Sequence, residues 1–145
     1  MRVTIDKLMA QGVVVAKPDH TADYVRRQMS TLEIHAVPVA DDEGRAIGIV
    51  RTRDLLGSVS PETPVAEIMC SDPVVVVDTI EVQAAASLLR RRRHHHLVVT
   101  RDEKIVGIVS AFDFLELIEG HRFELVEEPP EFRTGIIEVP EDLRG

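Results

Sequence analysis

Hydrophobic and polar positions follow the same order twice along this chain. In each half, a short segment with apolar residues at helical spacing is followed by a run of valines, a longer segment with helical spacing, and two apolar segments around a polar turn. Residues 3–56 align with residues 63–115 at an offset of 60, which falls to 59 after the polar turn. A repeat of this length indicates one folding unit that was duplicated.

The repeated pattern predicts the same elements in each half, a helical turn followed by the order β-α-β-β-α. The valine runs at 13–15 and 74–77 are too short for a buried helix and rich in β-branched residues, so both predict buried strands. Capping residues precede each longer helix, and a polar turn joins the last two strands into a hairpin. The other expected elements are opening turns at 5–9 and 65–69, helices at 22–32 and 82–89, strands at 36–39, 46–50, 97–99 and 105–109, and closing helices at 52–56 and 112–118.

The duplication also predicts the organisation of the chain. We expect a first repeat over residues 1–58, a second over 59–119, and an acidic C-terminal tail over 120–145 that repeats nothing earlier. Two copies of one unit imply a pseudo-twofold axis and a pair of equivalent clefts, which are the expected functional sites. The tail combines acidity and proline, typical of disorder, with apolar residues that would suit a strap on a surface.

Composition limits the fold and the partners. Of the 145 residues, 44% are apolar but only 3% aromatic, so the core must be aliphatic, which favours a sheet covered by helices in an α/β fold. A formal charge of −8 argues against general affinity for nucleic acid. Cys70 is the single cysteine, and no apolar stretch has the length of a signal peptide or a membrane span, so we expect a soluble cytoplasmic protein that does not bind membranes.

Both copies resemble the CBS domain, a unit found in tandem pairs called Bateman modules. The segment 107–113 (Gly-Ile-Val-Ser-Ala-Phe-Asp) matches the family's glycine, two hydrophobic residues, Ser or Thr, two variable positions and an acid, and the opening at 65–69 matches as well. The resemblance covers residues 3–118. It implies two pseudo-symmetric repeats packed through their sheets, a flat homodimer, and an adenosine-containing ligand in the cleft between the repeats.

Ser110 and Asp113 are the leading candidates for contact with such a ligand. A serine at a strand end places a hydroxyl and an exposed amide at a helix start, and a carboxylate one turn later can accept both hydroxyls of a ribose. An acid in the first helical turn can also serve only to stabilise the helix dipole. The resemblance assigns the ribose contact to Asp113, and it places the adenine against four residues of the same repeat: Val74, Val75, Leu97 and Val98.

The first copy departs from this motif. It keeps the acid, Asp54, but carries Arg51 where Ser or Thr is usual, with Thr52 one place late. Three hypotheses follow. The cleft is blocked or empty, or it takes a more highly phosphorylated ligand paired by Arg51 and Arg53, or both arginines are exposed to solvent.

Four arginines and three histidines occupy residues 90–96. They can form a nucleic-acid patch, a metal site in which His94 and His96 share one face of a strand, or a basic helix end whose histidines face the cleft between the repeats. We favour the last, since the resemblance places the positions of His95 and His96 near ligand phosphates, and His35 matches His95 in the first copy. A solvated basic face is the remaining alternative.

No catalytic or metal-binding set is visible at a persuasive spacing, so we expect a binding protein without turnover. The expected ligand is an adenine nucleotide (AMP, ADP or ATP) or S-adenosylmethionine, and the expected output is a signal to a partner protein. Two alternatives stay open. One is a ligand-free scaffold in which the duplicated fold serves only dimerisation, and the other is nucleic-acid binding through the arginines of 90–93.

Overall fold

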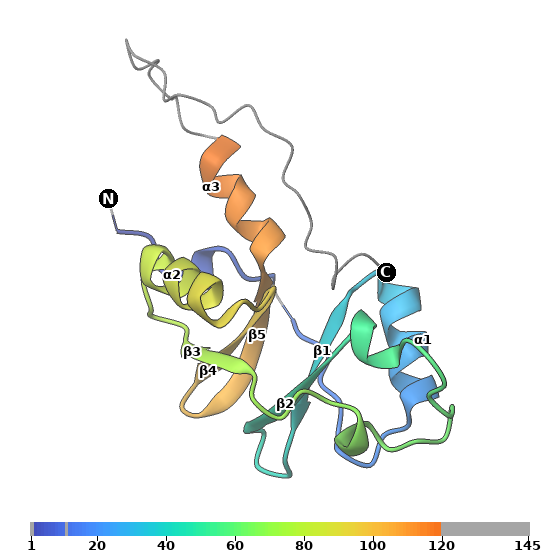
Figure 1. Ribbon diagram of the computed structural model, residues 1–145. Helices are drawn as coiled ribbons and strands as arrows, with labels where there is room; N and C mark the ends of the chain where they lie inside the picture. Colours follow the sequence, from blue (N-terminus) through green and yellow to red (C-terminus); the bar gives the residue numbers. More distant parts are fainter. Residues whose placement is uncertain (1, 11, 120–145) are drawn as a thin grey trace, which may run out of the picture.

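The computed structural model of this protein describes residues 2–10 and 12–119, and it shows two lobes that correspond to the two repeats (Figure 1). In the first repeat, helix α1 is followed by the hairpin of β1 and β2. The elements of this repeat are the 3-10 turn η1 (Ile5–Lys7), α1 (Ala22–Leu32), β1 (Ala36–Ala40), β2 (Ala46–Arg51) and the 3-10 turn η2 (Thr52–Leu55).

The second repeat follows the same order and adds a strand before its helix. It consists of the 3-10 turn η3 (Val65–Glu67), β3 (Val74–Val77), α2 (Val82–Arg92), β4 (His96–Arg101), β5 (Lys104–Ser110), the 3-10 turn η4 (Ala111–Phe114) and α3 (Leu115–Glu119). The mixed α/β architecture and the order of elements confirm the fold expected from the duplication. The closing elements begin as 3-10 turns, and only the second continues into an α-helix.

Each repeat contributes a small sheet. Strands β1 and β2 pair antiparallel, while β3 pairs parallel with β4 and β4 pairs antiparallel with β5. The strand expected at 13–15 is wrong, because this segment pairs with β1 only through an isolated bridge between Ala16 and Val39. The expectation that all of 74–77 is buried is also wrong, because β3 alternates and leaves Val75 and Val77 exposed.

The two long helices end in the same backbone geometry. Helix α1 ends at Glu33 with φ 54° and ψ 42°, and α2 ends at Arg93 with φ 54° and ψ 39°, so both caps are left-handed. Residues of opposite charge therefore occupy one structural position in the two repeats.

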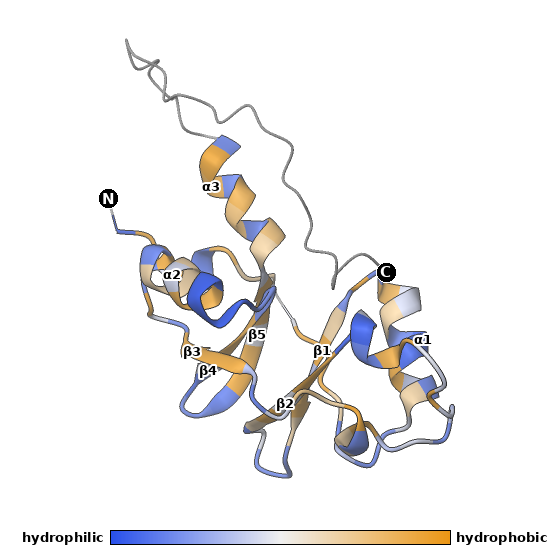
Figure 2. Ribbon diagram, in the orientation of Figure 1, coloured by the Kyte–Doolittle hydropathy of each residue, from blue (hydrophilic) through white to orange (hydrophobic). Residues whose placement is uncertain are grey.

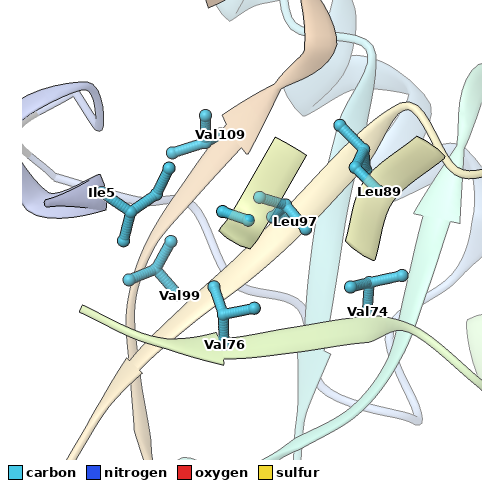
Figure 3. Close-up of a cluster of buried hydrophobic side chains, with 8 residues drawn as sticks. Ile5, Val74, Val76, Leu89, Leu97, Val99 and Val109 are labelled. Carbon is cyan, nitrogen blue, oxygen red and sulfur yellow. The ribbon is translucent and has the colours of Figure 1, made fainter. Parts of the chain in front are cut away.

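The hydrophobic cores are completed by exchange of the opening turns. Ile5 of η1 is fully buried in the core of the second repeat, among Val99, Val109 and neighbouring side chains (Figure 3). Val65 of η3 is fully buried in the core of the first repeat. Figure 1 shows the same exchange, with the dark blue turn on the side of β5 and the green turn of η3 below α1.

A third apolar cluster joins the two sheets. Ala36 and Ile49 of the first repeat pack with Val98 of the second, and Ile108 lies against them. This cluster confirms that the repeats pack through their sheets. Hydrophobic residues are concentrated on the strands, and hydrophilic ones gather at the hairpin tips and at the end of α2 (Figure 2). None of the helices among the described residues combines the length and apolar character needed to cross a membrane.

The glycines of the repeated motif make room for methionines rather than for a ligand. A Cβ at Gly107 would lie 2.7 Å from Met9 Sδ, and one at Gly48 would overlap Met69 Sδ and lie 3.0 Å from the carbonyl oxygen of Cys70. Met9 and Met69 follow the exchanged opening turns. The glycines therefore allow the turns to sit against the sheets.

The substitution Gly48→Ala should destabilise the protein, because the backbone carbonyl of Cys70 cannot move as easily as a methionine side chain. We expect the free energy of unfolding to fall by about 1–3 kcal/mol, measured by urea denaturation. Gly107→Ala should cost less, since its new Cβ would meet only the flexible Met9. The exposed Ser87→Ala on α2 serves as a control, and a Gly48→Ala midpoint equal to that of the wild type would contradict this account.

Candidate ligand-binding site

A cavity of about 630 Å³ lies between the two repeats. Its walls come from three parts of the chain: the segment after η1, the end of α1 with the start of β1, and the β4, β5 and η4 region of the second repeat. The lining residues are Ala10, Gly12, Val13, Val14, Leu32, Glu33, Ile34, His35, Ala36, His96, Ile108, Ser110 and Asp113. An occupant of this cavity would therefore contact both repeats.

Ser110 and Asp113 form a reciprocal cap at the start of η4. The amide of Ser110 donates to Asp113 Oδ2 at 2.8 Å, and the amide of Asp113 donates to Ser110 Oγ at 3.2 Å. The expectation of an exposed Ser110 amide is wrong, because this amide is already bound. Within the described residues no donor reaches Asp113 Oδ1, so this oxygen and the serine hydroxyl remain available at the cavity wall.

His96 lies opposite Ser110 in the β4–β5 pairing, and it also lines the cavity. Its Nδ1 is buried, and no hydrogen-bond partner for this atom exists in the described part of the chain. Burial is the main cause that lowers the pKa of His96, and charges on His95, His35 and Arg51 act in the same direction, while Asp113 opposes them. The site thus holds an imidazole that favours its neutral form and lacks a partner for one nitrogen.

The other predicted histidines take different places. His35 lines the cavity from the first repeat. His95 is exposed and does not line it, although its carbonyl oxygen accepts a hydrogen bond of 2.7 Å from the amide of Ala111. His94 lies nearer the arginines, and burial followed by the charge of Arg92 lowers its pKa.

The structure does not bring the four predicted adenine contacts to this cavity. Val74, Leu97 and Val98 are at most 1% exposed and belong to the apolar clusters, and Val75 is exposed outside the cavity. Val13 and Val14 of the first repeat take the corresponding place on the wall. The exchange of the opening turns explains this difference, because it brings residues 12–14 to the same cavity as Asp113 of the other repeat.

In the equivalent motif of the first repeat, the acid Asp54 is bound by Arg51 in an ion pair. Arg51 Nε lies 2.9 Å from Asp54 Oδ2, and a terminal guanidinium nitrogen lies 3.0 Å from Oδ1. The Arg51 amide donates to Oδ2 as well, at 2.8 Å. The two side chains are only 19% and 12% exposed, and the bond to Asp54 raises the pKa of Arg51 above its usual range.

Thr52 belongs to another hollow, of about 430 Å³, on the outside of the first repeat between α1 and η2. His35 contributes to both hollows, whereas Arg51 and Asp54 line neither of them. The two copies of the motif are therefore unequal: one presents a carboxylate oxygen to a cavity, and the other binds its carboxylate to its own arginine.

The described residues contain no group of three or more His, Cys, Asp or Glu side chains that could hold a metal ion. The arginines at the end of α2 are partly paired, as Arg92 contacts Asp72 Oδ2 at 2.7 Å. The run at 90–96 is thus the basic end of a helix, with His96 directed to the cavity.

Several wall residues were not identified from the sequence. Glu33 caps α1, Ile34 follows it, and Ile108 belongs to β5, so all three lie near positions of the repeated pattern. The aligned pair of Glu33 and Arg93 was a visible signal, because it reverses charge within otherwise similar segments. The sequence alone does not show that Glu33 lines a cavity, so the effect of this charge reversal on a ligand could not be inferred from it.

Comparison with known proteins agrees with this architecture. A CBS domain-containing protein of Dictyostelium discoideum is 30% identical over 134 residues, covering 81% of this chain and 92% of the relative. The magnesium transporter MgtE of Thermus thermophilus is 31% identical over 120 residues, covering 81% of this chain but only 25% of the transporter. The chain therefore spans about a quarter of that protein's length.

Solved structures show the same fold. The CBS domain pair of protein MJ0100, in complex with 5′-methylthioadenosine and S-adenosyl-L-methionine, superimposes with a TM-score of 0.76 at 18% identity, covering 83% of this chain and 98% of that one. The family model of the CBS domain matches twice, over residues 5–61 and 65–120. Two matches that together take in most of the sequence establish that this chain belongs to the CBS domain family.

Proposed function

We propose that this CBS pair is a regulatory module that binds an adenosyl ligand in the cavity beside Asp113 and signals its occupancy to a partner protein. The observation that carries the proposal is that no donor from the described residues reaches Asp113 Oδ1, which lies with the hydroxyl of Ser110 on the wall of a cavity of about 630 Å³. The complex of the MJ0100 pair with two adenosyl compounds supports this ligand class.

The polar and apolar parts of the cavity suit the two parts of a nucleoside. A vicinal diol can donate to Asp113 Oδ1 and to the remaining lone pair of Oδ2, and the Ser110 hydroxyl can donate to a ribose oxygen. A purine needs an apolar slot, which Val13, Val14, Ile34 and Ile108 supply from three segments.

Signalling would follow from the position of the cavity. Since its walls belong to both repeats, a ligand can bind one relative arrangement of the repeats more tightly than another. We further propose that two chains form a homodimer and that the partner protein responds to its geometry. The ligand-free scaffold remains the second candidate, because the Arg51–Asp54 ion pair already occupies the acid of the first repeat.

The substitution Asp113→Ala should abolish the proposed contact with the diol. Isothermal titration calorimetry with AMP, ADP, ATP, NAD, S-adenosylmethionine and 5′-methylthioadenosine should identify at least one binder, and the variant should bind it at least about tenfold more weakly, because hydrogen bonds to a carboxylate are lost.

Asp54→Ala is the matched control, since Asp54 holds the same place in the first repeat but does not line the cavity. It should leave this affinity within about twofold. Urea denaturation of both variants would establish that they are folded. Absence of binding across the panel, or equal loss in the two variants, would favour the scaffold.

The partly buried His96 predicts a pH dependence of stability. Its folded pKa lies below its unfolded value of about 6.5, so the unfolded chain binds the proton more readily. The free energy of unfolding should keep its full value above about pH 6.5 and decrease as the pH falls below it. Urea midpoints measured between about pH 7.5 and about pH 5.5 should decrease.

His96→Gln should remove part of that decrease. His94→Gln is the comparison, because its pKa is lowered too but its imidazole is less buried. If the pH dependence of the urea midpoint is the same in the His96 variant as in the wild type, burial does not lower the pKa of His96 as expected.

A further inference from the structure

The permanently charged residues described on the cavity wall are all negative. Among the described lining residues, Glu33 and Asp113 are carboxylates, and none is Lys or Arg. The remaining ionisable groups on the wall are His35 and His96, and burial lowers the pKa of His96 so that its neutral form is favoured. A ligand phosphate placed here would meet two negative side chains and no permanent cation from these residues.

The fold itself does not cause this lack of cations. At the positions of the other repeat that correspond to Leu32, Glu33 and Ser110, the chain carries Arg92, Arg93 and Arg51. Glu33 and Arg93 even share the same left-handed backbone conformation. At each of these three positions the repeat fold accommodates an arginine in one copy. The copy that lines the cavity carries an uncharged or acidic residue instead.

Two arginines outside the wall, Arg51 and Arg92, are held by carboxylates. Arg51 is held by Asp54 in the pair described above. Arg92 contacts both the carboxylate and the carbonyl oxygen of Asp72, at 2.7 and 3.3 Å. If Arg51 or Arg92 were to contact a phosphate in the cavity, its present pair would have to break.

We propose that this cavity selects an adenosine derivative without phosphate groups, such as a nucleoside thioether or sulfonium, over AMP, ADP and ATP. This inference rests on the proposed function and specifies its ligand. Each phosphate adds negative charge that the two carboxylates repel, whereas a sulfonium or ammonium group is attracted to them. A thioether substituent forms no strong hydrogen bonds, so it loses none in a cavity lined mostly by apolar residues.

Calorimetry near neutral pH and at one ionic strength tests this selection. 5′-Methylthioadenosine and S-adenosylmethionine should bind more tightly than AMP, and AMP more tightly than ATP, with at least about a tenfold difference between 5′-methylthioadenosine and ATP. The measurements should use the full chain of 145 residues.

The substitution Glu33→Arg introduces the residue that the second repeat has at this position. It should tighten ATP binding about tenfold and change 5′-methylthioadenosine binding by less than about threefold. Glu62→Arg changes the charge by the same amount at an exposed linker position and should alter neither affinity.

The outcomes separate this inference from the proposed function. Tightest binding of ATP, lost in Asp113→Ala, would overturn the ligand class and leave the adenosyl site standing. Absence of binding by every compound would overturn both. Binding of 5′-methylthioadenosine that responds to neither Asp113→Ala nor Glu33→Arg would show that another surface is used, which also contradicts both.

Discussion

The exchange of opening turns between the repeats is the constraint on which the rest of the structure depends. Ile5 and Val65 are both fully buried, each in the core of the opposite repeat, and their amides donate 2.8 Å hydrogen bonds to the carbonyl oxygens of Ile80 and His20. Neither core is complete alone, so the two repeats form one cooperative unit. The exchange also brings Ala10 and residues 12–14 to the second repeat, and these residues supply one wall of the cavity. The site is thus a consequence of how the cores are closed.

The two motifs differ in how their acids are bonded, and this difference follows from the residue three positions before each acid. In both repeats, the amide before the closing turn donates to the acid three residues later at 2.8 Å. Ser110 adds a small hydroxyl and leaves Asp113 Oδ1 without a donor from the described residues, whereas Arg51 places its guanidinium on both oxygens of Asp54. Because the backbone contact is the same, the difference in chemistry arises from the residue at this position alone.

The sequence predicted those features that depend on neighbouring residues. Helical spacing identified α1 and α2, and the polar turns identified both hairpins, because caps and turns are local. The segment 13–15 failed as a strand because pairing with β1 requires tertiary contacts, and only Ala16 makes them. Val74 and Val98 are as hydrophobic as the residues of a purine pocket, and sequence alone does not distinguish a core position from a cavity wall. The apolar wall was missed because Val13 and Val14 line the same cavity as Asp113 but belong to the opposite repeat.

The position of Asp113 also determines how occupancy could reach the rest of the molecule. Asp113 lies in η4, and α3 begins two residues later at Leu115 without an intervening loop. A ligand that engages the carboxylate therefore acts on a turn that continues directly into a helix. That segment carries exposed apolar side chains, with Phe112 77% and Ile118 50% exposed, so a shift of η4 would move an apolar surface as well as the cavity wall. The first repeat lacks this path, because η2 ends at Leu55, Leu56 is extended with ψ 155°, and no helix continues from it. Under the proposed function, the second repeat would therefore supply both the carboxylate that meets the ligand and the helix that responds to it.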